Sequence, residues 1–191
     1  MRKLKLQVQT TLDGFIAGPS GEMDWMNFNW GEDINNYVKT ITEPIDCILL
    51  GRKLAQGFIP HWASLPPGEE GGVNKMNNTT KVVFTKTMDT TSPEVSGWNN
   101  TVLAKGDLVD EVNKLKKAEG QDIMAYGGAT FVSALIRHGL IDEYHLFVNP
   151  AAISTGMPIF KAQAGRMNFN LVKATPFACG IVALCYEPKI G

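Results

Sequence analysis

Three short segments of the sequence combine glycine, hydroxyl and basic residues in a way that suits phosphate binding. Each follows an apolar run typical of a buried strand, and they cover residues 51–53 (Gly-Arg-Lys), 85–86 (Thr-Lys) and 127–128 (Gly-Gly). Arg52 offers a planar set of donors and Lys86 a point charge. The glycine pair leads into a helical spacing that includes Phe131, so free backbone N–H groups at a helix N-terminus would face an anion. Together the segments suit a ligand with two separated phosphate groups, such as NADPH.

Each signal also has a plain structural explanation. Glycine pairs commonly form tight turns, and Arg52 or Lys86 alone could be a solvated charge at a strand end. The agreement of all three favours a ligand site, because open parallel sheets bind ligands at the carboxyl ends of their strands.

The elements that must position these residues alternate along the chain. Strand patterns cover residues 4–10, 47–50, 81–85, 101–104, 123–126 and 141–149, with a terminal antiparallel pair at 168–175 and 180–186. Helical patterns cover 32–42, 54–58 and 108–117, the last with Asp107 as N-cap, and one from Phe131 to Gly139. Loops are expected at 13–30 and 60–72. We therefore predict an α/β fold, a mostly parallel sheet covered on both faces, in one domain over residues 1–191.

Bulk composition narrows the function classes. A net charge of −1 and a charged fraction of 19% offer no field for nucleic acid or for an anionic membrane. No apolar run approaches the roughly 20 residues needed to span a bilayer, and no apolar segment typical of a signal peptide follows the N-terminus. Cys47, Cys179 and Cys185 are separated and lie in apolar sequence, which favours free thiols, a cytoplasmic location and no structural metal.

Four motifs, in order and spacing, resemble the dihydrofolate reductase-like superfamily: residues 11–18 (TLDGFIAG), 48–53 (ILLGRK), 82–86 (VVFTK) and 126–129 (YGGA). The stretch 140–144 (LIDEY), followed by Pro150, Gly156, Pro158 and Phe160, is similar to the reductase domain of the riboflavin-pathway deaminase–reductase. The resemblance covers nearly the whole chain. It implies a three-layer dihydrofolate reductase-like fold, NADPH as hydride donor and a small pyrimidine- or pteridine-type substrate.

The resemblance also implies roles for particular residues. Ile16 and Ala17 would lie against the nicotinamide, while Thr85 and Lys86 would lie at the adenosine end. The phosphates would be held by Gly51, Arg52 and Lys53, with Arg52 at the 2′-phosphate, and the pyrophosphate by Tyr126, Gly127, Gly128, Ala129 and Thr130. Residues 18–25 resemble a mobile flap, and Leu12 and Trp25 would face the substrate.

Two departures limit the resemblance. Leu54 stands beside the cofactor where many members carry a hydroxyl residue, and residues 154–158 read Ser-Thr-Gly-Met-Pro in place of the usual Gly-x-Gly-x-Pro. The sequence also shows no zinc-binding deaminase segment, so we expect a protein other than the bifunctional enzyme. The alternatives left open are a reductase of 5-amino-6-(5-phosphoribosylamino)uracil, a dihydrofolate reductase and a non-catalytic nucleotide-binding module.

The proton donor has competing candidates. Asp33 or Glu32 could grip the substrate ring from the first long helix, or both could be N-terminal acids that the helix dipole favours. Asp13, at the end of the first strand, could open towards the nicotinamide or form a turn with Gly14. The family is commonly dimeric, and the terminal strands, with Phe177, Ile181, Val182 and Leu184, could pair two subunits.

Overall fold

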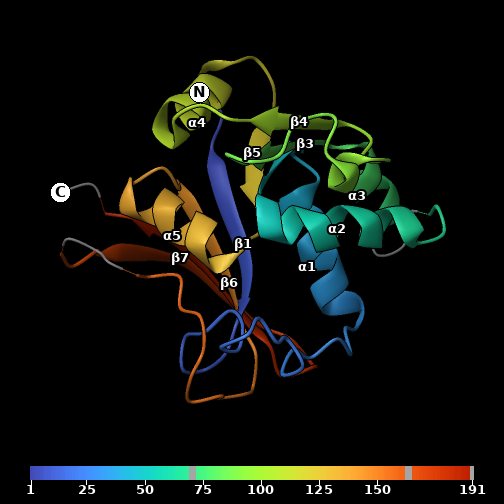
Figure 1. Ribbon diagram of the computed structural model, residues 1–191. Helices are drawn as coiled ribbons and strands as arrows, with labels where there is room; N and C mark the ends of the chain where they lie inside the picture. Colours follow the sequence, from blue (N-terminus) through green and yellow to red (C-terminus); the bar gives the residue numbers. More distant parts are fainter. Residues whose placement is uncertain (69–71, 162–164, 190–191) are drawn as a thin grey trace.

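A computed structural model describes residues 1–68, 72–161 and 165–189 and contains one eight-stranded sheet (Figure 1). The strand order is β4-β3-β2-β5-β1-β6-β8-β7. Pairing is parallel from β4 to β6 and antiparallel where β6 meets β8 and β8 meets β7. The strands are β1 (Leu4–Thr10), β2 (Ile45–Gly51), β3 (Thr80–Phe84), β4 (Thr101–Ala104), β5 (Asp122–Ala125), β6 (Glu143–Val148), β7 (Phe169–Pro176) and β8 (Val182–Pro188).

Helices cover both faces of the sheet and give three layers (Figure 1). One face packs against α1 (Glu32–Thr42), α2 (Arg52–Ser64) and α3 (Val73–Asn78), and the other against α4 (Leu108–Lys117) and α5 (Ala129–Arg137). A 3-10 turn, η2 (Pro93–Val95), precedes β4. None of the helices in the described residues is long and apolar enough to cross a bilayer.

The sequence patterns explain the layers. In β1, Leu4, Leu6 and Val8 point to the α4 and α5 side, because successive side chains of a strand alternate between faces. In β2 the run from Cys47 to Leu50 is buried on both sides, as expected for a strand in the middle of a parallel sheet. The predicted mostly parallel sheet with a terminal antiparallel pair is confirmed.

One part of the predicted element list is wrong. Residues 60–64, expected in a loop, continue α2, and α3 was not predicted; residues 69–71 of that expected loop lie outside the described residues. Pro60 lies on the exposed side of α2, where it removes a single helical hydrogen bond. Ile59 and Trp62 pack into the core with β2 and β3, and this packing keeps the residues after Pro60 helical.

The residues expected to pair two subunits are also partly misplaced. Phe177 and Ile181 are 7% and 0% exposed and pack with Ile34 of α1 and Phe147 of β6. They belong to the core of this chain, so they cannot form a subunit contact without unfolding part of it.

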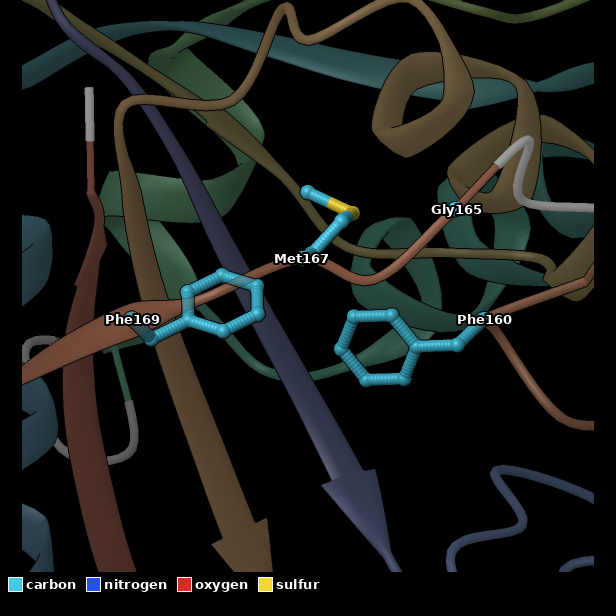
Figure 2. Close-up of a pocket in the computed structure, with 4 residues that line it drawn as sticks. All are labelled: Phe160, Gly165, Met167 and Phe169. Atoms are coloured by element: carbon cyan, nitrogen blue, oxygen red, sulfur yellow. The ribbon is translucent and has the colours of Figure 1, made fainter. Parts of the chain in front are cut away.

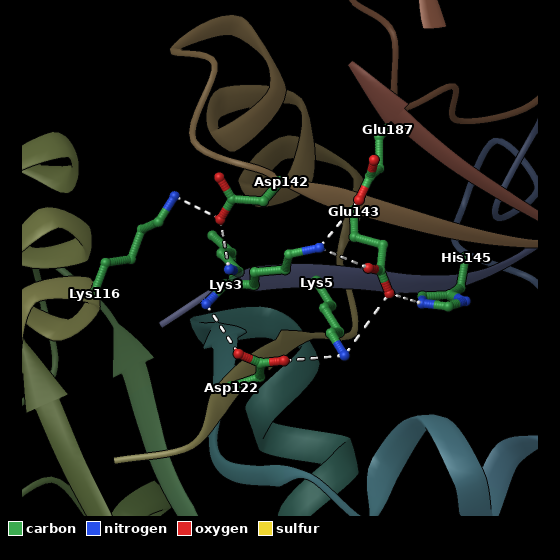
Figure 3. A network of polar contacts seen from close by, with 9 residues as sticks. Lys3, Lys5, Lys116, Asp122, Asp142, Glu143, His145 and Glu187 are labelled. Atoms are coloured by element: carbon green, nitrogen blue, oxygen red, sulfur yellow. Dashed lines mark hydrogen bonds and ion pairs between the residues drawn. The ribbon is translucent and has the colours of Figure 1, made fainter. Parts of the chain in front are cut away.

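At the amino-terminal edge of the central strands, charged side chains form a network across β1, β5, β6 and β8 (Figure 3). Lys5 Nζ lies 3.0 Å from Asp122, Lys3 Nζ 3.0 Å from Glu187, and Lys116 Nζ 2.6 Å from Asp142. Glu143 accepts from His145 Nε2 at 2.7 Å and lies 3.7 Å from Lys5. These contacts hold the strands in register at the edge opposite the predicted ligand site.

No spacing of ligand residues in the sequence predicts a metal site, yet three groups with ligand chemistry meet beside this network. Donor atoms of Glu143, His145 and Cys185 lie within 4.8 Å of one another. The two ring nitrogens of His145 are already engaged, with Glu143 at 2.7 Å and the Tyr37 hydroxyl at 3.3 Å. Burial and the nearby Glu143 carboxylate raise the pKa of the Cys185 thiol to about 11, so the sulfur is held as a thiol. The cluster is accounted for as a structural polar contact.

Candidate functional site

The carboxyl ends of β2 and β5 are neighbours and bring Gly51 and Gly127 together. The amide of Gly51 donates to the carbonyl of Gly127 at 3.5 Å, and the Gly127–Gly128 peptide bond is cis. Gly127 has φ +138°, which favours glycine. A Cβ on Gly51 would stand 2.8 Å from Cβ of Phe131 in α5. The glycines therefore permit a close approach of two strand-to-helix connections.

Both helices that follow these glycines begin without a side-chain cap. The N-cap residues are Gly51 for α2 and Gly128 for α5, and neither helix has an acidic residue in its first turn. By contrast, α4 is capped by Asp107, whose carboxylate accepts from the amides of Val109 and Asp110. Uncapped first-turn N–H groups and a positive dipole end both favour an anion. Two such ends on adjacent strands form a place where linked phosphate groups can bind.

The predicted cationic residues lie along the same edge. Arg52, in the first turn of α2, is partly exposed and forms no side-chain hydrogen bond or ion pair with the described residues. Lys53 is exposed, and Leu54 packs close to Gly127, since a Cβ there would stand 3.4 Å from its Cδ2. Arg52 is therefore free to bind an anionic ligand.

At the third predicted strand end, after β3, the polar side chains already form hydrogen bonds within the protein. The Lys86 ammonium donates to the carbonyls of Lys105 and Gly106 at 3.0 and 2.8 Å. The Thr85 hydroxyl is buried and accepts from the amides of Thr87 and Met88. Both residues shape the turn after β3, and Lys86 remains exposed as a positive charge at that position.

On the other half of the edge, beyond β1 and β6, three segments form what we call the loop layer: residues 11–33, 149–160 and 177–181. The amide of Leu12 donates to Ala151 at 2.8 Å, and Ile16 and Met157 are joined by a hydrogen bond of 3.0 Å. Asn27 Nδ2 donates to the carbonyl of Cys179 at 2.8 Å. In Figure 1 these loops lie together below the arrowheads of the central strands. The layer brings together chain segments more than a hundred residues apart.

The two candidate carboxylates are both part of these contacts. Asp13 accepts from the amides of Ile153 and Ser154 at 3.1 and 2.7 Å, and Asp33 accepts from the amide of Ala178 at 2.8 Å. Hydrogen bonds from the Thr11 hydroxyl and from those two amides hold the pKa of Asp13 below its usual value. The amides of Ala178 and Ile34 likewise lower the pKa of Asp33. The exposed Glu32 shares the first turn of α1 with Asp33.

The predicted nicotinamide and substrate residues all belong to the loop layer. Ile16 and Ala17 are each 9% exposed and pair with the backbone at Met157, whereas Leu12 is 68% exposed. Trp25 is partly buried, and its indole Nε1 is shielded from solvent with no hydrogen-bond partner among the described residues. An acceptor atom on a bound ring could satisfy that donor.

Sequence reasoning missed the residues that hold the layer in place. Asn149 is fully buried; its Oδ1 accepts from the amide of Asn27 and its Nδ2 donates to Gln9. Gly156 lies so close to the Ala17 carbonyl that a Cβ would overlap it. An Asn as the last residue of a predicted buried strand was the available signal for Asn149, since a buried amide must find partners.

Two hollows are formed by described residues, and Phe160, at the end of the loop layer, contributes to one of them. One, of about 310 Å³, is lined by Phe160, Gly165, Met167 and Phe169 (Figure 2). A polar one, of about 490 Å³, adjoins the amino ends of β2 and β3, with Ile45, Asp46 and Thr80 in its lining. Neither has a predicted site residue in its described lining, so the candidate site rests on hydrogen-bonding geometry and charge.

Comparison with known proteins identifies the family. The family model of the RibD C-terminal domain matches residues 2–183, and this chain belongs to that family. It is 32% identical to the uncharacterized protein YyaP of Bacillus subtilis, over 97% of this chain and 95% of that protein. It is 24% identical to the riboflavin biosynthesis protein RibD of Corynebacterium ammoniagenes, over 81% of this chain and 44% of that protein.

Solved structures share the fold. A putative riboflavin biosynthesis protein from Shewanella sp. PV-4 aligns with a TM-score of 0.76 and 24% identity, over the full length of both chains. The diaminohydroxyphosphoribosylaminopyrimidine deaminase/5-amino-6-(5-phosphoribosylamino)uracil reductase of Thermotoga maritima aligns with a TM-score of 0.69 and 18% identity, over 98% of this chain and 57% of that one. The resemblance and the fold predicted from the sequence are confirmed.

Proposed function

We propose that this chain is an NADPH-dependent oxidoreductase that reduces a small pyrimidine- or pteridine-type heterocycle, in the manner of the riboflavin-pathway reductases. The observation that carries this proposal is the pair of uncapped N-termini of α2 and α5 on adjacent strands, with Arg52 free beside them. That arrangement fits a dinucleotide with a pyrophosphate and one further phosphate.

The residues present suit that cofactor in a definite order along the sheet edge. Gly127, Gly128 and the first-turn amides of Ala129 and Thr130 would hold the pyrophosphate, and Tyr126 leads into this turn. Arg52, supported by Lys53, would bind the 2′-phosphate, with Thr85 and Lys86 at the adenosine end. Ile16 and Ala17 would support the nicotinamide at the border of the loop layer. The cofactor, when bound, supplies the hydride.

The loop layer would then position the heterocycle and exclude water. Leu12, Trp25 and Asp33 are the proposed substrate contacts. Asp13 and Asp33 are the candidate catalytic carboxylates, and their lowered pKa values favour an orienting role over proton donation. We therefore assign the proton to a water molecule that these carboxylates orient.

Titration with NADPH, followed by quenching of tryptophan fluorescence, tests the shared part of the proposal. We expect saturable binding at micromolar NADPH, with weaker binding of NADH. The absence of binding would reject both the enzyme and the non-catalytic module. Oxidation of NADPH is then measured with 5-amino-6-(5-phosphoribosylamino)uracil and dihydrofolate, and with 5-amino-6-ribosylaminouracil and 7,8-dihydrobiopterin, which carry the same rings without phosphate or carboxylate. Turnover identifies an enzyme, and dihydrofolate turnover favours the folate-reductase alternative. Binding without oxidation by these or related rings favours the module.

We also propose that the chain forms a homodimer through the terminal strands, at two of the expected residues, Val182 and Leu184, together with the edge strand β7. Val182 and Leu184 of β8 are half-buried, and Leu171 and Val172 of the edge strand β7 are 56% and 57% exposed. Exposed apolar residues on an edge strand are a common surface for subunit pairing. Sedimentation of Leu171→Lys would give a monomer where the unchanged chain gives a dimer, and a monomer for both would reject this interface.

The three cysteines are free thiols, which favours the expected cytoplasmic location.

A further inference from the structure

The carboxyl edge of the sheet is divided by charge. On the side of β2, β3 and β4 it carries Arg52, Lys53, Lys86 and Lys105. The loop layer contains no Lys, Arg or His in any of its three segments, and the sequence has none from residue 6 to 38 or from 146 to 160. The layer instead carries five exposed carboxylates: Asp13, Glu22, Asp24, Glu32 and Asp33.

The layer also lacks an alternative way to bind an anion. Its one helix N-terminus is that of α1, whose first turn already holds Glu32 and Asp33. Acidic residues there occupy the positive end of the helix and repel a second anion. A phosphate group is most strongly held by Arg, Lys or a free helix N-terminus, and the described residues of the layer offer none of these three.

What the layer exposes in place of cations is apolar and aromatic surface. Leu12, Met23 and Phe28 are 68%, 49% and 70% exposed, and Trp25 lies between them in sequence. Beneath this surface the indole Nε1 of Trp25 is a shielded hydrogen-bond donor without a partner among the described residues. Exposed apolar side chains with a few polar groups suit a flat, largely apolar ligand.

We propose that the substrate is a planar heterocycle that carries no phosphate or carboxylate group and is neutral or cationic. This inference rests on the proposed function, and it narrows the substrate class within it. It separates this chain from an enzyme whose substrate carries a phosphoribosyl group, as the name of the Thermotoga maritima relative states. It also disfavours dihydrofolate, because the glutamate of that molecule would bring carboxylates to a layer whose charged side chains are all acidic.

Two matched pairs of compounds test the proposal by isothermal titration calorimetry on the protein saturated with NADP⁺, which has no hydride to transfer, so that binding is measured without reaction. The first pair is 5-amino-6-ribosylaminouracil and its 5′-phosphate, and the second is 7,8-dihydrobiopterin and dihydrofolate. We expect the uncharged member of at least one pair to bind, and to bind at least tenfold more tightly than its anionic partner. Tighter binding of the anionic member in either pair would overturn the proposal, as would no binding of either uncharged ring at millimolar concentration. NADPH binding is measured first, so failure of the proposed function is seen separately.

A charge-reversal variant tests whether the acidic side chains of the layer exclude anionic ligands. Asp24 is exposed in the loop layer. Asp24→Lys should lower the ratio of the dissociation constants of the phosphorylated and unphosphorylated compounds, which we call the discrimination, at least threefold. Glu119→Lys makes the same charge change at an exposed position before β5, at the opposite edge of the sheet, and should leave the discrimination unchanged. Equal effects of the two variants, with NADPH affinity retained in both, would show that the charge of the layer does not select the substrate.

Discussion

Gly51 and Phe131 are so close that a methyl group on Gly51 would stand 2.8 Å from Cβ of Phe131. The contact joins the end of β2 to the first turn of α5, and these are the two places where the proposed phosphate site is built. The backbone of Gly51 has φ −75°, which any residue can adopt. Glycine is therefore required there for space and not for conformation.

Gly51→Ala should push α5 away from β2. We expect a loss of about 1–3 kcal/mol in the free energy of unfolding, as for an overpacked core position, and at least tenfold weaker NADPH binding. Gly57→Ala in the middle of α2 is the matched control, since a Cβ there meets nothing within 4 Å. It should be neutral or stabilise by about 0.5–1 kcal/mol. Urea unfolding measures both, and an equal response of the two variants would contradict the steric explanation.

The substitution Arg52→Ala should weaken the binding of NADPH far more than the binding of NADH. Loss of hydrogen bonds to a charged group costs about 1.5–3 kcal/mol, which corresponds to roughly ten- to a hundredfold in the NADPH dissociation constant. NADH lacks the 2′-phosphate and should change less than threefold. Lys53→Ala, at the exposed neighbouring position, should affect NADPH by less than fivefold. If Arg52→Ala weakens both cofactors equally, Arg52 does not recognise the 2′-phosphate.

Asp13→Asn distinguishes an orienting carboxylate from a proton donor. The lowered pKa of Asp13 keeps it ionised at neutral pH, and an Asn side chain can still accept one of the two amide hydrogen bonds. We expect the kcat of the Asn variant to stay within about fivefold of that of the unchanged enzyme. The Asp13→Ala variant should have a lower kcat, and protease should cleave it faster within residues 149–160. An Asn variant as inactive as the Ala variant would instead make Asp13 the acid.

Glu143→Gln should show how much the amino-terminal network contributes to stability. The hydrogen bond from His145, with Lys5 and Lys3 nearby, lowers the pKa of Glu143 from 4.5 to about 2. A carboxyl with a depressed folded-state pKa stabilises the fold above its unfolded value, and the gain is lost as pH falls through the folded value. The free energy of unfolding of the unchanged protein should therefore be larger than that of the variant by up to about 3 kcal/mol above pH 4.5. This difference, measured by urea unfolding at a series of pH values, should shrink towards pH 2.

Glu187→Gln is the control for that experiment. Glu187 is 43% exposed and pairs with Lys3 alone among the described ion pairs, so its loss should cost less than about 1 kcal/mol. A Glu143→Gln effect that does not change with pH would mean that lost packing, and not the charge, is responsible.

Local patterns were enough to predict the sheet. The alternation in β1, the continuous apolar run of β2 and the Asp107 cap each depend on a few neighbouring residues, and all three are confirmed. The continuation of α2 past Pro60 was missed because packing of Ile59 and Trp62 on β3 outweighs the local effect of proline. Long-range contacts were equally out of reach: no sequence pattern pairs Asp13 with Ser154 or Asn27 with Asn149, because those partners meet only after the sheet has formed.

The different starts of the helices also affect how quickly their amides exchange with deuterated water. In α4 the Asp107 carboxylate holds the amides of Val109 and Asp110, so both are protected without any ligand. The corresponding amides of α2 and α5 have no side-chain acceptor in the part of the chain that the structure describes and should exchange rapidly in the free protein. Mass spectrometry after addition of a dinucleotide should then find slowed exchange at 52–54 and 129–131, with α4 unchanged. Isotope exchange can thus locate the phosphates on this chain without any measurement of turnover.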